Sequence, residues 1–282
     1  MKTILVPLEE SPGLDSQLET ALLLARRFGS YVEGVHVRPE LPDVGAWEGT
    51  IVTPMLIESF KTQDQEHSRR LKDRFEAFMQ GHGIPRGPAM RPSDEASSAW
   101  LEEPISGLDE LGRRGRVFDI IVAGRPGKEA DRPATATVET ALFEAGRAVL
   151  IAPPTPLRTL GETVVIAWNG STEAARTTTL AFPLLRLAKK VVVLTIRDGM
   201  VPGPSGIEAA RHLSRNGIEA TTRDVTADGR TVGVAILAEA AAVGADLLIK
   251  GAYTHSRLRQ MIFGGATNHI LVSAEVPVFM AH

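Results

Sequence analysis

The chain has no cysteine among its 282 residues. This absence excludes disulfides, zinc sites built from thiolates, iron–sulfur clusters and cysteine nucleophiles. The 31 basic and 34 acidic residues nearly balance, and a net charge of -3 gives no electrostatic footprint for nucleic acid. The apolar runs have the length of strands, well short of the roughly 18 residues of a membrane-spanning helix. The N-terminus enters a strand pattern without the apolar region of a signal peptide. We therefore expect a cytoplasmic protein that binds neither nucleic acid nor membrane.

Catalytic signatures are also missing from the sequence. It has no nucleophile elbow, no Walker lysine motif and no paired-histidine zinc helix. Four of the histidines, at positions 67, 82, 212 and 269, lack metal-ligand spacing with any carboxylate or with each other. His36 follows a strand pattern and is expected to be a satisfied or half-buried structural residue. These absences predict a protein that is not an enzyme, with at most a weak ATPase activity.

What the sequence does contain is an internal repeat. Three segments of the first half recur in the same order in the second, namely Thr3–Ser11 as Thr163–Ser171, Phe118–Gly124 as Ala245–Gly251, and Arg147–Ala152 as Val276–Ala281. The first copy carries an insertion, which consists of a Pro- and Gly-rich loop at Arg38–Met55 and an amphipathic helical pattern at Leu56–Gly81. A repeat of this length predicts a duplicated domain.

Apolar strand patterns alternate with amphipathic helical patterns in both halves. In the second half we expect strands near Thr163–Trp168, Lys190–Thr195, Ala220–Val225, Asp246–Lys250 and Val278–Ala281, and helices near Thr172–Ala188, Ser205–Asn216, Thr231–Gly244 and Gly265–Ala274. This alternation is typical of a parallel sheet that is covered on both faces. The predicted fold class is α/β, with two tandem, doubly wound, open parallel five-stranded sheets. They span residues 1–153 and 160–282 and are joined by a Pro-rich linker.

A ligand of such a sheet binds beyond the carboxyl ends of the strands. In the second half, the turn after the first strand and the loop after the fourth strand lie there. The candidate ligand residues are Ala167, Trp168, Asn169, Gly170 and Ser171 in the turn, and Gly251, Thr254, His255, Arg257, Gly264, Gly265, Ala266 and Thr267 in the loop and the start of the next helix.

The chemistry of these segments suits a nucleotide. Gly264 and Gly265 can bring backbone N–H groups close to a phosphate at the positive end of a helix. Thr267 adds a hydroxyl in the first helical turn, and Asn169 can contact a base or a ribose. Each feature also has a plain structural interpretation: the glycine pair as a tight entry into a helix, and the Asn-Gly pair as turn chemistry.

The span from Gly251 to Thr267 resembles the signature of the universal stress protein family. In that signature a Gly is followed by two residues, a Gly, nine residues, and then Gly with Ser or Thr. Its four positions fall here on Gly251, Thr254, Gly264 and Gly265, so the second and the fourth differ. The turn at Asn169 is similar to the family's turn, which usually has Asp. The resemblance covers nearly the whole chain, as in a tandem two-domain member.

The resemblance implies an adenine-nucleotide α-hydrolase-like, Rossmann-like fold. The residue at the position of Asn169 would lie by the adenine and ribose, and the glycine loop would wrap the phosphates. It implies ATP or AMP as the ligand, with Mg²⁺ only if ATP is bound, although many members bind no ATP. Members often pair through their final strands, so a tandem chain can satisfy this pairing internally, and a homodimer of such chains is a further option.

The first copy is a poorer candidate for nucleotide binding. Gly124 and Gly127 match the first two glycines of the signature, but no glycine pair follows. Glu9 and Glu10 put carboxylates where a nucleotide would bring more negative charge. We expect this copy to be a packing partner.

The leading hypothesis is a universal stress protein that acts as a regulatory module in the stress response and holds an adenine nucleotide in its second domain. The first alternative is an interaction or scaffold protein of the same fold that binds no nucleotide. The second is an enzyme, such as an AMP-forming transferase, which would need a catalytic acid, base or lysine at the loops.

Overall fold

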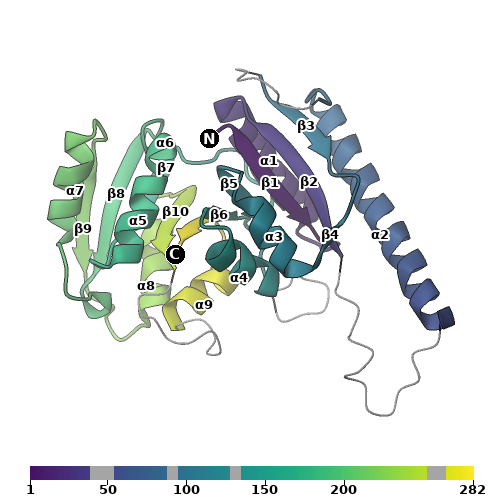
Figure 1. Ribbon diagram of the computed structural model, residues 1–282. Coiled ribbons are helices and arrows are strands. Elements are labelled where there is room, and N and C mark those ends of the chain that lie inside the picture. Colours follow the sequence, from purple (N-terminus) through teal and green to yellow (C-terminus); the bar gives the residue numbers. More distant parts are fainter. Residues whose placement is uncertain (39–53, 88–94, 128–134, 253–264) are drawn as a thin grey trace, which may run out of the picture.

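The computed structural model describes residues 1–38, 54–87, 95–127, 135–252 and 265–282. In the first half, strands and helices alternate along the chain (Figure 1). The elements are β1 (Thr3–Leu8), α1 (Leu14–Phe28), β2 (Tyr31–Arg38), α2 (Pro54–Gly81), β3 (Ser97–Trp100), β4 (Ile105–Ser106), α3 (Gly107–Gly115), β5 (Ile120–Ala123), α4 (Thr135–Glu144) and β6 (Ala148–Ile151). The strands pair in parallel in the order β3-β2-β1-β5-β6, and the short β4 pairs with the end of β2.

The second half repeats this architecture. Its elements are β7 (Thr163–Ala167), α5 (Thr172–Leu180), α6 (Phe182–Leu185), β8 (Lys190–Ile196), a 3-10 turn (Arg197–Gly199), α7 (Gly206–Arg215), β9 (Thr221–Val225), α8 (Val232–Ala242), β10 (Leu247–Gly251), α9 (Gly265–Ser273) and β11 (Val278–Ala281). The parallel order β9-β8-β7-β10-β11 is the order of the first half, strand for strand. The predicted fold class, two tandem doubly wound five-stranded parallel sheets, is confirmed.

The last strands of the two halves pair with each other. β6 and β11 run antiparallel, and Leu150 lies opposite Phe279 in their register. We call this pair the seam. It joins the two five-stranded sheets into one, and the direction of the strands reverses across it. The carboxyl ends of the first-half strands therefore lie at the opposite edge of the sheet from those of the second half.

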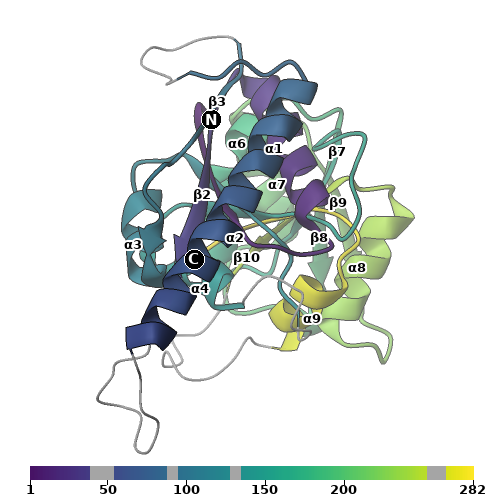
Figure 2. The same cartoon turned by 90° about the vertical axis from the view of Figure 1, so that its right-hand side faces the viewer.

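Helices cover both faces of this sheet (Figures 1 and 2). Side chains alternate along each strand, so Ile4 and Val6 join one hydrophobic cluster while Leu5 joins the other. At the seam, Leu150 and Phe279 belong to the first cluster, and Met280 belongs to the second. Each cluster thus contains residues of both halves. Among the helices that the structure describes, none combines the length and the apolar character needed to cross a bilayer.

Several helices of the second half have a serine or threonine as their N-cap residue. The Ser171 hydroxyl accepts a hydrogen bond from the backbone N–H of Ala174, and Ser205 forms a reciprocal capping box with Glu208. The single helix predicted over Thr172–Ala188 is wrong, because α5 ends at Leu180 and α6 starts anew. Pro183 lies in the first turn of α6, and its ring and missing N–H are incompatible with a continuous helix.

The insertion of the first half forms α2, close to the prediction. Leu71 and Phe75 are buried against the sheet, where the ring of Phe75 lies 5.9 Å from that of Trp100. A Cβ atom at Gly34 would lie 2.9 Å from the Phe75 ring, so the glycine is required for this contact. Trp100 is therefore a packing residue, whereas Trp47 and most of the predicted loop lie outside the described residues.

The N-terminal turns of α2 project past the sheet (Figure 1). Met55 is 84% exposed and Phe60 is 48% exposed. The amphipathic pattern of this segment thus corresponds to buried side chains in the C-terminal half of α2, whereas Phe60 is half exposed. The reason is geometric, since a helix of this length outreaches the strands that it covers.

In each half, an equivalent aspartate accepts a hydrogen bond from the backbone of the first strand. The carboxylate of Asp119 accepts a hydrogen bond of 3.1 Å from the backbone N–H of Thr3. The carboxylate of Asp246 accepts one of 2.8 Å from the backbone N–H of Thr163. Both side chains lie at the amino ends of the strands, where they hold the entry into the first strand of each half.

Candidate functional site

The turn after β7 lies at the carboxyl edge of the second half. The side-chain oxygen of Asn169 accepts a hydrogen bond of 3.2 Å from the backbone N–H of Ser171. Gly170 has a φ of 83°, and a Cβ atom there would lie 3.1 Å from the carbonyl oxygen of Val201. Ser171 caps α5. The turn chemistry of the Asn-Gly pair is thus present, and it holds a half-buried Asn169 at the edge of the sheet.

Ala167 and Trp168, the first two candidates in this turn, are core residues. Ala167 packs in the hydrophobic cluster on one face of the sheet, and Trp168 packs in the cluster on the other. The indole N–H of Trp168 donates a hydrogen bond of 2.8 Å to the carbonyl oxygen of Pro204. The donor of this side chain is therefore occupied within the protein.

Gly251 brings the turn and the end of β10 together. A Cβ atom at this position would lie 2.6 Å from the backbone of Glu173 and of Ala174 at the start of α5. Because no side chain fits there, only glycine lets α5 begin so close to the strand. The first glycine of the predicted signature thus has a packing role at the edge where the ligand is expected.

The start of α9 approaches the same edge. Gly265 is exposed and has open space around it, and Ala266 is half-buried against Gly233. Thr267 is buried, and its hydroxyl faces the end of β10. Four predicted site residues, namely Thr254, His255, Arg257 and Gly264, lie outside the described residues. Of the others, the structure brings Ser171, Gly251 and Thr267 to one edge.

Lys250 is a member of this edge that the sequence interpretation missed. Its ammonium group donates hydrogen bonds of 2.9 Å to the Thr267 hydroxyl and of 2.8 Å to the carbonyl oxygen of Gly251. Burial lowers the pKa of Lys250 to about 8. A signal was present in the repeat, since Lys250 stands in an apolar strand where the first copy has Ala123.

The corresponding place in the first half carries the opposite charge. The carboxylate of Glu9 accepts a hydrogen bond of 2.7 Å from the hydroxyl of Thr137. Thr137 is the third residue of α4, as Thr267 is of α9. The equivalent threonines therefore face a carboxylate in one half and an ammonium group in the other.

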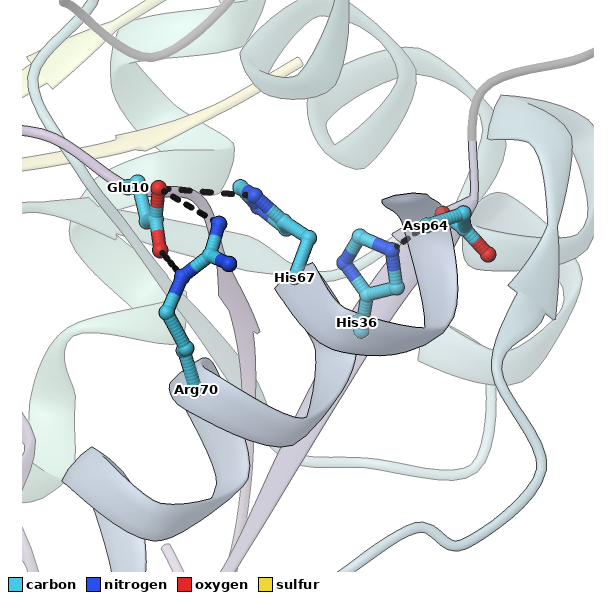
Figure 3. A network of polar contacts seen from close by, with 5 residues as sticks. All are labelled: Glu10, His36, Asp64, His67 and Arg70. Atoms are coloured by element: carbon cyan, nitrogen blue, oxygen red, sulfur yellow. Dashed lines mark hydrogen bonds and ion pairs between the residues drawn. The ribbon is translucent and has the colours of Figure 1, made fainter. Parts of the chain in front are cut away.

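Glu10 continues this acidic edge in a network with α2 (Figure 3). Its carboxylate lies 2.8 Å from Nε of Arg70 and 3.5 Å from Nδ1 of His67. The hydrogen bond from Arg70 lowers the pKa of Glu10, and burial lowers the pKa of His67. The Glu10 carboxylate is thus already neutralised within the protein, by a side chain of the inserted helix.

His36 extends the network toward the start of α2. Its Nε2 lies 2.8 Å from the Asp64 carboxylate, and its ring centre lies 5.1 Å from that of His67. Burial opposes ionisation of Asp64, but hydrogen bonds from His36 and Arg38 outweigh it and lower the pKa of Asp64. His36 was expected to be satisfied or half-buried; it is buried, and although Nε2 is paired, Nδ1 has no hydrogen-bond partner among the described residues. In the described part of the chain, no group of three or more His, Asp or Glu side chains is placed so that it could hold a metal ion.

The loop after β5, which matches the start of the signature in the first half, contacts the second half instead. Arg125 is buried and donates hydrogen bonds to the carbonyl oxygens of Ile270, Leu271 and Val276. These carbonyls lie in the last turns of α9 and just beyond it, where a cation also meets the negative end of the helix. The loop position is therefore structural.

Comparison with known proteins agrees with this geometry. The profile of the universal stress protein family matches residues 162–282. This half of the chain belongs to the universal stress protein family. The matched region runs from the start of β7 to the end of the chain, and so it contains the whole edge that carries Asn169, Lys250 and Thr267. The search among curated proteins gave no match.

Solved structures extend the likeness to both halves. The chain is similar to a universal stress protein from Archaeoglobus fulgidus DSM 4304, with a TM-score of 0.68 and 16% identity over 99% of this chain and 97% of that one. It is also similar to a functionally unknown protein from Pseudomonas aeruginosa PAO1, with a TM-score of 0.54 and 15% identity over 100% and 92%. At these identities the likeness concerns the fold.

Proposed function

We propose that the second half of this universal stress protein binds an adenine nucleotide at the carboxyl edge of β7 and β10, with Mg²⁺ only when the nucleotide is ATP. One observation carries the proposal: the Ser171 hydroxyl, Gly251 and the Thr267 hydroxyl lie at this edge, where β10 and the start of α5 come close together. Such an edge is where an open parallel sheet takes its ligand.

In this proposal the protein is a regulatory module of the stress response and does not turn over its nucleotide. Asn169 contacts the base or ribose, and Thr267 lies on the phosphate side. The first half supports the second through the seam and Arg125, since its own edge is occupied by Glu9 and Thr137. A cytoplasmic location belongs to the same proposal, with which a chain without cysteine is compatible.

Isothermal titration with ATP, ADP and AMP tests the proposal. Thr267→Val keeps the shape of the side chain and removes the hydroxyl, so we expect nucleotide affinity to fall by about tenfold. Thr137→Val makes the same change at the equivalent buried position of the first half, and we expect it to leave affinity unchanged.

Absence of binding by the unmodified protein at millimolar nucleotide would reject the proposal. That result would favour the alternative of an interaction protein that binds no nucleotide. The departures of Thr254 and Gly265 from the family signature would then explain the missing affinity. Equal losses in Thr267→Val and Thr137→Val would place the ligand elsewhere, and steady release of phosphate from ATP would favour an enzyme.

A further inference from the structure

The end of β10 carries a cation, Lys250, that has no ion-pair partner in the described part of the chain. The ammonium group of Lys250 donates to two neutral oxygens, those of Thr267 and Gly251. Desolvation of the ammonium is the cause of its lowered pKa. A partly buried charge of this kind is costly unless an opposite charge accompanies it.

The first half shows that the fold does not need a lysine here. Ala123 occupies the equivalent strand position, and the threonine of the following helix donates to Glu9 instead. The two halves share strand order, strand-entry aspartates and the helical threonine. The lysine therefore distinguishes the second edge in chemistry rather than in architecture.

We propose that Lys250 binds the phosphate chain of the ligand and makes the second-half site prefer nucleoside diphosphates and triphosphates to adenosine and AMP. This inference rests on the proposed function and names the ligand class of the same site. An ammonium has three N–H donors, and two are engaged by oxygens of the site itself. A phosphate oxygen supplies an acceptor for the third and the missing negative charge.

The closing experiment compares ATP, AMP and adenosine in the full chain and in two variants. Lys250→Met keeps the apolar stem and removes the charge. We expect its affinity for ATP to fall by about tenfold or more, with adenosine binding unchanged. Lys250→Arg keeps a cation that does not titrate, and we expect it to retain the preference for ATP.

The pH dependence supplies a readout that a merely structural lysine would not move. The affinity of the unmodified protein for ATP should fall as the pH rises from 7.5 to 9, because the ammonium of the free protein loses its proton near pH 8. At pH 8.5 binding should take up protons, which titrations in two buffers of different ionisation enthalpy detect. Other titratable groups near β10 in the described part of the chain, among them Glu173, His269 and His282, remain in Lys250→Arg, so any pH dependence due to them persists in that variant.

The outcomes separate this inference from the proposed function. If the unmodified protein binds no nucleotide, both are overturned. If it binds ATP and Lys250→Met binds ATP equally well with an unchanged circular dichroism spectrum, the inference fails and the proposed function stands. An unfolded Lys250→Met leaves Lys250→Arg and the proton uptake to decide, and a Lys250→Arg variant with the full pH dependence would overturn the role of Lys250.

Discussion

Arg125 is one of the residues that connect the two halves. Its guanidinium donates to three carbonyl oxygens at and beyond the end of α9, and the whole side chain is buried. The carbonyl oxygen of Ile270 also accepts a hydrogen bond from the backbone N–H of Ala274, whereas Leu271 and Val276 lie in the last turn of the helix or past it, where helical N–H donors run out. Loss of the arginine would therefore leave buried acceptors unpaired.

We expect Arg125→Met to lower the free energy of unfolding by about 2–4 kcal/mol, because buried carbonyls lose their donors. Urea denaturation of the full chain measures this loss. The matched control is Arg147→Met, since Arg147 is exposed and donates to the carbonyl oxygen of Arg116. The control should change stability by no more than about 0.5 kcal/mol. Similar losses in both variants would contradict the role of Arg125.

The individual side chains of the site were only partly predictable from the sequence. The Asn-Gly-Ser turn has a local pattern, and the structure shows its hydrogen bonds within three residues along the chain. Arg125 could not be assigned, because its partners lie about 145 residues away and meet it only in the folded sheet. Lys250 was not selected as a site residue, because one lysine at the end of an apolar run leaves the strand pattern recognisable and draws no attention to itself.

At the scale of an element, the two ends of α2 differ in how much apolar surface they bury. Its C-terminal half packs on β2 and β3 through Phe75, whereas Phe60 lies on turns that project past the sheet. The two phenylalanines belong to one helix and have similar local sequence propensity. Burial alone therefore distinguishes them.

We expect Phe75→Ala to lower the free energy of unfolding by about 3–5 kcal/mol, since it opens a cavity beside Trp100. Phe60→Ala, the matched control, should change it by less than about 1 kcal/mol, because the side chain is already half exposed. Denaturation curves of the two variants give both values. A large loss in Phe60→Ala would mean that this end of α2 is covered in solution.

The boundaries of most helices and strands could be predicted from the hydrophobic pattern of the sequence. The second-half strands were predicted within a residue or two. Four of them are mostly buried apolar runs, which have a strong signal, whereas β9 is polar and largely exposed. The one broken helix, at Pro183, was missed because its amphipathic pattern continues across the break. Exposure of Phe60 was missed because helical spacing gives the direction of a side chain but not the extent of the surface beneath it.

At the scale of the whole molecule, both hydrophobic clusters cross the seam. We therefore expect the two halves to unfold together in urea. Trp100 in the first half and Trp168 in the second are both buried and report on each half by fluorescence. The double variants Trp47→Phe with Trp100→Phe, and Trp47→Phe with Trp168→Phe, leave one reporter each. Their midpoints should shift alike with Arg125→Met, whereas separate transitions would show that the halves fold independently.

The seam also has a consequence for how this protein can change by mutation. In a dimer of identical chains, any substitution at one ligand edge appears at the other edge as well. Here one chain contains both halves as separate segments, so a single substitution changes the carboxyl edge of only one half. The acidic edge of Glu9 and the cationic edge of Lys250 lie at opposite ends of the joined sheet. Each was thus free to acquire its own charge while the other kept its chemistry.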